Sequence, residues 1–293
     1  MSHLTSARHF RRLAGIAAAL AIGCLGCVVG AGAQDLERKA LRVCQDPNNL
    51  PFSNTAAEGI ENRLADLFGK QLGLPVTYYT YPERFAFVRN TLKYKLPGDD
   101  YPCDIMMGVP VGFDQVSVTK PYYRSTYALV IPQGHGMDAV HSGDDFLHLD
   151  PALLGRLRIG IYDRSPASAW LVKHGLVDRG VPYHILNADP AQYPGQIIEN
   201  DLASGKIDVA IVWGPIAGFF AKRVKSPQLA VIALHSEPGV RFDYPMAMGV
   251  RYGEKEWKAQ VEQFIDGNRA AIEAILKDYG VPLVDESYAS TRP

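Results

Sequence analysis

The chain has 293 residues, of which 47% are hydrophobic and 21% are charged. This composition is ordinary for a folded globular protein and excludes disordered, collagen-like and coiled-coil chains. With 30 basic and 31 acidic side chains, no nucleic-acid partner is expected. Three basic residues and no acidic ones lie in residues 1–33, which leaves 27 basic side chains against 31 acidic ones, a net charge of −4, in the rest.

The first 33 residues have the pattern of an export signal. Arginines near the start precede an uncharged run at 13–32, and small residues before Gln34 predict cleavage there. A transmembrane anchor is one alternative, because the run is long enough to span a bilayer, but it is mostly Ala and Gly. A lipoprotein is another, since Cys24 and Cys27 each follow a glycine. The sequence therefore predicts a periplasmic protein with a cleaved signal peptide and no stable membrane insertion.

After the predicted cleavage site only Cys44 and Cys103 remain. Two cysteines in an oxidising compartment often pair, and closing this loop would stabilise the fold by about 4 kcal/mol. Two buried free thiols are the alternative. The histidines show no His-x-x-His or similar spacing, so the sequence predicts neither a metal site nor a cofactor.

In chain order, the first half of the remaining chain alternates predicted strands and helices. The strands are expected at residues 41–44, 76–81 and 104–108. Thr55 and Glu58 have the spacing of a capping box, so a helix is expected to begin there and to end at Gly73. A second helix is expected to begin at Pro82. This order predicts a parallel sheet in an α/β lobe.

The second half repeats this alternation. Its strands are expected at residues 158–162, 184–186 and 207–213. Ser165 followed by Pro166 predicts the start of one helix, and an apolar pattern predicts another that ends at Gly205. A single long helix, starting near Trp257 and closed by Gly280, is expected at the end of the chain.

Two apolar strands, at residues 127–131 and 244–250, are placed to cross between these halves. Two α/β lobes joined by two crossings form a clamshell, and the cleft between such lobes is where ligands bind. The predicted boundaries are 34–130 plus 240–293 for the first lobe and 131–239 for the second.

Several strings resemble the periplasmic solute-binding proteins of the polar amino-acid type. They are LRVC (41–44), PFS (51–53), DIMMG (104–108) and PYY (121–123). Two longer strings resemble a subgroup that is linked with quinoprotein alcohol dehydrogenases and includes the MxaJ and XoxJ proteins of methanol oxidation. These are CQDPNNLPFSN (44–54) and PCDIMMGVP (102–110). The resemblance covers residues 34–293 and implies a two-lobed α/β fold of the type II periplasmic-binding-protein kind.

Two departures from the wider family concern the ligand. Amino-acid binders place an arginine about a dozen residues before the PYY segment, where it pairs with the ligand carboxylate. Here residues 108–115 contain no basic residue, and residues 213–215 lack the acidic residue that usually holds the ligand amine. An amino-acid ligand is therefore not expected.

Nine residues are candidates for the cleft or a partner surface: Asp46, Asn48, Asn49, Phe52, Ser53, Tyr122, Arg164, Ser165 and Trp213. The resemblance places the turn that contains the first three at the mouth of the cleft. Several have a simpler structural interpretation. The first three can act as turn formers, and Phe52 and Trp213 as buried aromatic residues. Ser165 can be a helix cap only, or can hold an anion together with Arg164. A concentration of tyrosines in the first lobe is either strand packing or an interface: Tyr78, Tyr79, Tyr81, Tyr94 and Tyr101.

The resemblance implies an accessory protein of a PQQ-dependent alcohol (methanol) dehydrogenase, which assists its maturation or activation by protein binding. The implied partners are this dehydrogenase and its cytochrome c, and no catalytic residue is expected. The alternatives are a conventional ABC-transporter solute-binding protein for a small non-amino-acid ligand and, third, a dehydratase-like enzyme. No Gly-x-Ser-x-Gly elbow, Gly-x-Gly-x-x-Gly turn or Walker motif supports an enzyme.

Overall fold

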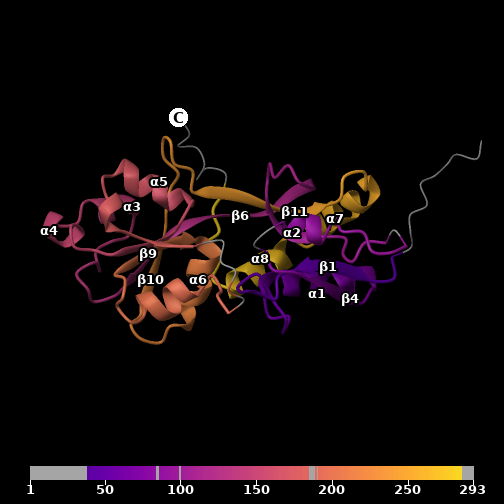
Figure 1. Ribbon diagram of the computed structural model, residues 1–293, viewed down its shortest axis with the longest axis horizontal. Coiled ribbons are helices and arrows are strands. Elements are labelled where there is room, and N and C mark those ends of the chain that lie inside the picture. Colours follow the sequence, from indigo (N-terminus) through magenta and orange to yellow (C-terminus); the bar gives the residue numbers. More distant parts are fainter. Residues whose placement is uncertain (1–37, 84–85, 99, 185–188, 190, 286–293) are drawn as a thin grey trace, which may run out of the picture. The chain divides into compact units, whose positions relative to one another are not determined.

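A computed structural model describes residues 38–83, 86–98, 100–184, 189 and 191–285, all within one compact unit, Glu37–Pro293. The predicted signal peptide lies outside the described residues. Within this unit the chain forms two α/β lobes (Figure 1). The predicted lobe boundaries remain a prediction. None of the described helices is both long and apolar enough to cross a membrane.

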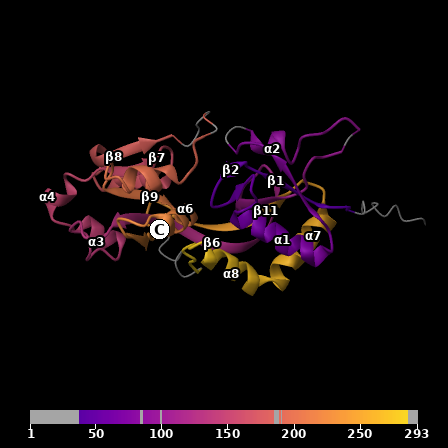
Figure 2. The same cartoon turned by 90° about the horizontal axis from the view of Figure 1, so that it is seen from below.

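The first lobe contains most of the N-terminal elements and the last two helices (Figures 1 and 2). Its strands are β1 (Leu41–Gln45), β2 (Asn48–Asn49), β3 (Ser53–Asn54), β4 (Val76–Thr80) and β5 (Met106–Pro110). Its helices are α1 (Ile60–Leu72), α2 (Phe87–Asn90), α7 (Lys255–Gly267) and α8 (Arg269–Asp278). Two long strands, β6 (Ser117–Pro132) and β11 (Asp243–Val250), continue from it.

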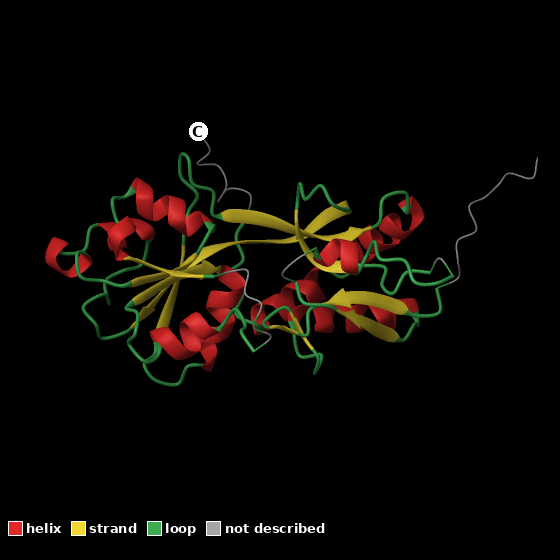
Figure 3. Cartoon of the chain, viewed as in Figure 1, coloured by secondary structure: helices red, strands yellow, loops and turns green. Residues whose placement is uncertain are grey.

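The second lobe is a sheet with helices on both faces (Figure 3). Its strands are β7 (Ile159–Tyr162), β8 (Gly180–Tyr183), β9 (Val209–Trp213) and β10 (Leu229–Ala233). Its helices are α3 (Gly143–Leu147), α4 (Pro151–Leu154), α5 (Pro166–Lys173) and α6 (Gly214–Arg223), with a 3₁₀ turn η1 (Val177–Arg179) and a π-helix η2 (Ile197–Leu202).

One strand forms hydrogen-bonded pairs with strands of both lobes. The 16-residue β6 pairs antiparallel with β11 over its first part and with β9 and β10 over its last part. The resulting order is β5-β11-β6-β9-β7-β8, with β10 also on β6. Because β6 belongs to the hydrogen-bonded ladders of both lobes, it positions the end of β9 beside the crossing.

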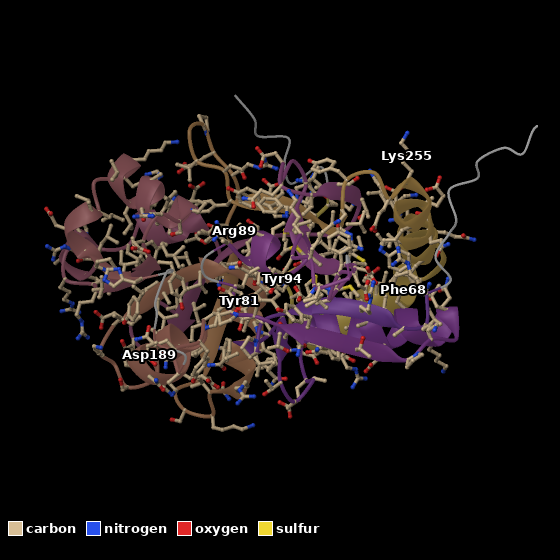
Figure 4. The ribbon with its side chains drawn as sticks, turned by 45° about the vertical axis from the view of Figure 1, so that its right-hand side comes forward. Phe68, Tyr81, Arg89, Tyr94, Asp189 and Lys255 are labelled. Atoms are coloured by element: carbon tan, nitrogen blue, oxygen red, sulfur yellow. A yellow bond between two sulfur atoms is a disulfide. The ribbon has the colours of Figure 1, made fainter. Side chains whose placement is uncertain are left out.

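The first-lobe core forms around Phe68 of α1 (Figure 4). Its ring stacks on Phe264 at 4.2 Å and on Trp257 at 5.5 Å between ring centroids. The apolar residues of α1 recur at helical spacing on one face, and the helix ends at Gly73 in the left-handed conformation (φ 66°), as predicted. Burying such aromatic residues supplies most of the driving force for packing α1 against α7.

The predicted start of α1 is wrong. The helix begins at Ile60 rather than at Thr55, and Asn62 Oδ1 accepts a hydrogen bond from Gly59 N at 3.0 Å. A Cβ on Gly59 would lie 2.0 Å from the carbonyl oxygen of Phe52, so the close approach of the preceding loop requires glycine there. The capping-box spacing did not reveal this tertiary contact.

The second predicted helix also begins later than expected. Pro82 lies in a loop, and α2 starts at Phe87, after Ala86 in the left-handed conformation (φ 53°). The backbone N–H of Glu83 donates to Asp46 Oδ2, which ties this loop to the end of β1. That bond holds the chain away from a helical path at the predicted position.

Three further expectations need correction. The predicted strand at 184–186 lies earlier, as β8, because the chain enters the sheet directly after η1; residues 185 and 186 lie outside the described residues. The single last helix is two helices, broken at Asn268, whose side chain donates to the carbonyl oxygen of Phe264. In the first lobe only β1 and β4 pair as parallel strands, with a parallel bridge from Val43 to Ile105, whereas β5, β11 and β6 are antiparallel.

Candidate functional site

The loop after β1 is held by its own polar side chains. Asp46 Oδ1 accepts a hydrogen bond from Asn48 N at 2.8 Å, which is the turn-forming role predicted for this aspartate. The buried Ser53 hydroxyl donates to the Asp46 carbonyl oxygen at 3.0 Å and accepts from Asp46 N at 3.2 Å. The loop is therefore closed on itself, and Asp46 is held in one position at the end of β1.

The disulfide between Cys44 and Cys103 is confirmed, with the two Cα atoms 5.2 Å apart. Both cysteines are buried in a small apolar cluster beside Val88 and Leu92. Cys44 lies two residues before Asp46, so the disulfide fastens the base of this loop to the strand region that contains Cys103.

Three carboxyl groups, from Asp46, Glu61 and Glu83, form what we call the acidic cluster. Glu83 Oε2 accepts a hydrogen bond from Asn49 Nδ2 at 2.7 Å, and Glu83 N donates to Asp46 Oδ2. Among the described residues no ion pair joins a lysine or arginine to any of the three carboxylates. Their negative charges therefore face one another without a described cationic side chain between them.

The pKa values follow from this arrangement. Loss of hydration raises the pKa of Glu83 to about 7, the Asp46 carboxylate adds to the rise, and the hydrogen bond from Asn49 opposes it. Glu83 is exposed as a residue, yet the protein surrounds its carboxyl group closely enough for lost hydration to dominate. Loss of hydration also raises the pKa of Glu61 well above its ordinary value, and the charges of Glu83 and Asp46 raise it further.

A cavity of about 280 Å³ adjoins the acidic cluster, close to the lower limit for small-ligand pockets. We call it the aromatic pocket. Its walls come from the loop after β1, the loop after β4, and the carboxyl ends of β7, β8 and β9. The lining residues are Asp46, Asn48, Asn49, Glu83, Tyr127, Tyr162, Tyr183, His184, Gln192, Tyr193, Pro194, Gln196, Ile197, Trp213 and Ile216.

Five of these lining residues are aromatic, and most of their hydroxyl groups are used elsewhere. Tyr162 donates to the carbonyl oxygen of Pro194 at 2.6 Å, Tyr193 donates to Glu199 Oε2 at 2.8 Å, and Tyr183 donates to Asp201 Oδ2 at 2.5 Å. Loss of hydration raises the pKa of each of these tyrosines, which keeps the phenols neutral. The hydroxyl groups of these three tyrosines are therefore already used in hydrogen bonds within the second lobe.

Trp213 and Tyr127 form the wall at the crossing strand. Tyr127 of β6 pairs in register with Trp213 of β9, and their rings lie 5.5 Å apart between centroids. Trp213 also meets the ring of Tyr244 at 5.9 Å, edge to face. The register of β6 thus determines which aromatic residues face the pocket.

Of the nine predicted site residues, four line this pocket: Asp46, Asn48, Asn49 and Trp213. Phe52 packs against the apolar cluster of the second lobe formed by η2, α6 and β9, while Ser53 is buried behind Asp46. These placements bring the loop at 46–53 against the second lobe.

The other three predicted residues lie outside the lining of the pocket. Tyr122 packs on the first-lobe core and donates its hydroxyl to the carbonyl oxygen of Met107 at 2.7 Å. Ser165 lies at the N-cap of α5 as predicted, but its hydroxyl donates to the carbonyl oxygen of Tyr162 at 2.6 Å instead of capping the helix. Arg164 is exposed, in the left-handed conformation (φ 58°). Their proposed binding roles stay predictions.

Sequence reasoning missed Glu83 and the tyrosines of the second lobe. A usable signal was present, because β7, β8 and β9 end in Tyr162, Tyr183 and Trp213. The carboxyl ends of neighbouring parallel strands meet at one edge of a sheet, where ligands bind. For Glu83 no such signal exists, since only its hydrogen bonds to the loop at 46–49 bring it to the pocket.

The lining chemistry limits what the pocket can hold. Among the described lining residues none is lysine or arginine, so the partner that an amino-acid carboxylate requires is missing. Within the described part of the chain, no group of three or more His, Cys, Asp or Glu side chains is arranged to hold a metal ion. The described lining combines two acidic residues and five aromatic ones with polar side chains such as those of Asn49 and Gln196.

The fold and this interlobe pocket define a periplasmic binding protein, and comparison with known structures agrees. No protein-family model matches the chain. The chain is similar to the crystal structure of the periplasmic binding protein XoxJ from Methylobacterium extorquens AM1, with 35% sequence identity, a TM-score of 0.67, and coverage of 84% of this chain and 100% of XoxJ. The chain therefore belongs to the XoxJ family of periplasmic binding proteins.

Other relatives extend the same grouping. Protein MoxJ of Paracoccus denitrificans is 26% identical over 280 residues, covering 89% of this chain and 97% of MoxJ. The crystal structure of MxaJ from Methlophaga aminisulfidivorans MPT has 24% identity and a TM-score of 0.69, with coverage of 84% of this chain and 100% of MxaJ. An ancestral cationic amino acid solute binding protein, at 17% identity and a TM-score of 0.60, shares the fold.

Proposed function

We propose that this protein is a periplasmic accessory protein of a PQQ-dependent methanol or other alcohol dehydrogenase, and that it assists maturation or activation by binding the dehydrogenase. The observation that carries the proposal is membership of the XoxJ family over the whole length of XoxJ. The missing carboxylate partner in the aromatic pocket supports it, because a conventional amino-acid receptor needs that partner. No enzymatic activity is proposed for this chain.

An exposed apolar patch on the first lobe is our candidate contact surface. Tyr94 and Tyr252 are 43% and 61% exposed, and Lys93 Nζ lies 5.8 Å from the centre of the Tyr252 ring. Tyr94 also stacks on Tyr79, with 6.5 Å between centroids, and Figure 4 labels it together with Tyr81 and Arg89 of this lobe. Exposed tyrosines are typical of protein interfaces.

The test is affinity capture from periplasmic extract with protein that starts at Gln34. We expect the quinoprotein dehydrogenase subunit among the bound proteins, and less of it with the variants Tyr94→Ser and Tyr252→Ser. The control is Val172→Ser, which removes an apolar side chain that is 64% exposed on the second lobe. Absence of the dehydrogenase from the material bound by the wild-type protein would contradict the proposal.

A second candidate function is a conventional solute receptor for a small ligand that is not an amino acid. The observation that favours it is the aromatic pocket itself, whose volume suits a small molecule. A receptor gains thermal stability from its free solute by mass action. Co-purification of a small molecule, with no dehydrogenase captured, would replace the accessory role by this one.

A further inference from the structure

Carboxylates lie near aromatic rings at two places in the protein, and the two places differ in their described cationic side chains. At Asp104 the chain supplies its own cations: Arg251 Nη2 lies 2.5 Å from Asp104 Oδ1, and its guanidinium lies 4.1 Å from the centre of the Tyr101 ring. Arg38 likewise contacts Asp104 and lies 4.1 Å over the ring of Trp257. In each case a guanidinium group lies between a carboxylate and a π face.

The aromatic pocket has the same two components without the cation. Asp46 and Glu83 supply the carboxylates, and Tyr127 and Trp213 supply rings. None of the described lining residues is a lysine or an arginine. The pocket therefore combines carboxylates and aromatic rings, as the surroundings of Asp104 do, but with no cationic side chain among its described lining residues.

The second-lobe tyrosines strengthen this pattern. Tyr183 donates its hydroxyl to Asp201 and Tyr193 donates to Glu199, so a carboxylate accepts from each phenol behind the ring. A phenol that donates to an anion gains electron density, and the negative face of its ring attracts a cation more strongly. Asp201 also pairs with Lys206 at 2.9 Å, and Glu199 pairs with Arg223 at 2.7 Å.

We propose that the aromatic pocket binds an organic cation, an alkylammonium or guanidinium group, with its charged group between the carboxylates of Asp46 and Glu83 and the faces of the aromatic rings. Two sources share this chemistry: a lysine or arginine side chain of a partner protein, and a free small amine. The first source rests on the proposed function, whereas the second does not. The raised pKa values of Glu83 and Glu61 agree with the absence of a cationic partner among the described residues.

Calorimetric titration of the protein from Gln34 onward tests the chemistry. The probes are n-butylammonium and ethylguanidinium, with n-butanol and butyrate as neutral and anionic controls of similar size. We expect the cations to bind at least tenfold more tightly than either control at pH 8. Glu83→Gln should weaken cation binding about tenfold, which corresponds to about 1.4 kcal/mol. The matched control is Glu256→Gln, the same change at an exposed position on α7, which should leave binding unchanged.

A second arm identifies the source. Purified methanol dehydrogenase is tested for binding to the wild-type protein and to Glu83→Gln, before and after acetylation of its lysines, which removes their charge. A partner lysine is indicated if the dehydrogenase binds Glu83→Gln more weakly than it binds the wild-type protein, and if acetylation of the dehydrogenase removes this difference. Equal binding to both proteins, with butylammonium still bound, indicates a free amine.

Failure of the inference and failure of the proposed function give different results. The inference is overturned if the cations bind no better than butanol and Glu83→Gln binds the dehydrogenase as the wild-type protein does. If the wild-type protein binds the cations but no dehydrogenase, the accessory role fails and the cation pocket stands with a free amine as its ligand.

Discussion

Asp104 and Glu83 are both carboxylates of the first lobe, but the protein surrounds them differently. Asp104 has a side chain that is 1% exposed, and it contacts Arg38, Arg42 and Arg251. Burial alone would raise the pKa of Asp104, but the hydrogen bonds from Arg42 and Arg251 outweigh it and the pKa lies below the usual range. The pKa of Glu83 moves the other way, to about 7, because loss of hydration raises it, the Asp46 carboxylate adds to the rise, and no described cationic side chain opposes it.

The two carboxylates therefore belong to different parts of the first lobe: Asp104 to the scaffold and Glu83 to the candidate site. A buried carboxylate with its cations in place is part of the scaffold, because removing either partner leaves an uncompensated charge. Carboxylates that have no cationic partner among the described residues, such as Glu83, have raised pKa values, and perturbed pKa values are typical of binding sites. The disulfide from Cys44 to Cys103 joins the two regions, since Asp46 follows one cysteine closely and Asp104 follows the other.

Removing the disulfide should have the largest effect on stability. Replacing both Cys44 and Cys103 by alanine opens a loop with a sequence separation of 59 residues. We expect a loss of about 4 kcal/mol in the free energy of unfolding, from chain entropy. Urea unfolding followed by circular dichroism measures it. A loss below about 1 kcal/mol would show that packing around the cysteines, rather than the cross-link, holds the two regions together.

Asp104→Asn should have the second-largest effect on stability. The variant leaves the side chains of Arg251 and Arg42 without their carboxylate in a buried position, so we expect a loss of about 3 kcal/mol in the same assay. Asp266→Asn is the matched control, because Asp266 pairs with Lys120 and Arg269 at the surface and its loss should change stability little. Similar losses of stability for both variants would contradict the structural role that we assign to the buried carboxylate of Asp104.

Glu83→Gln should have the smallest effect on stability, with the opposite sign. A carboxyl group whose folded-state pKa is raised keeps its proton in the folded protein between pH 4.5 and about 7, so stability falls as pH rises through this window. Glutamine removes that penalty. Because Glu83 is exposed as a residue, we expect the variant to gain only about 1 kcal/mol at pH 8 and nothing near pH 4.

Thermal unfolding across this pH range, with Glu256→Gln as the control, measures the effect. Because the charge of Glu83 raises the pKa of Glu61, the difference between the wild-type protein and the variant reports on these two groups together. A variant less stable than the wild-type protein at pH 8 would show that the Glu83 carboxylate is already neutralised by the protein.

Local sequence patterns predicted most strands and several ends of helices. The apolar runs of β1, β4, β7 and β9 lie where expected, and Gly73 ends α1 as predicted. The patterns failed where a distant segment decides the local structure. Helix α1 begins late because Gly59 packs against the Phe52 carbonyl group, and α2 begins late because Glu83 N bonds to Asp46. Neither contact has a signal within a short stretch of sequence.

The sequence by itself determined the two-lobed α/β class, the family, the cysteine pair and the loop that carries Asp46. The family and the loop follow from short strings, the class from the order of strands and helices, and the cysteine pair from the two cysteines that remain after residue 33. Only the tertiary structure decided that β6 serves both lobes, that Glu83 joins Asp46, and that Tyr127, Tyr162, Tyr183 and Trp213 face one cavity. The reason is physical: strand register and the meeting of strand ends depend on pairing between residues far apart in the chain, and a local pattern does not encode which partners meet.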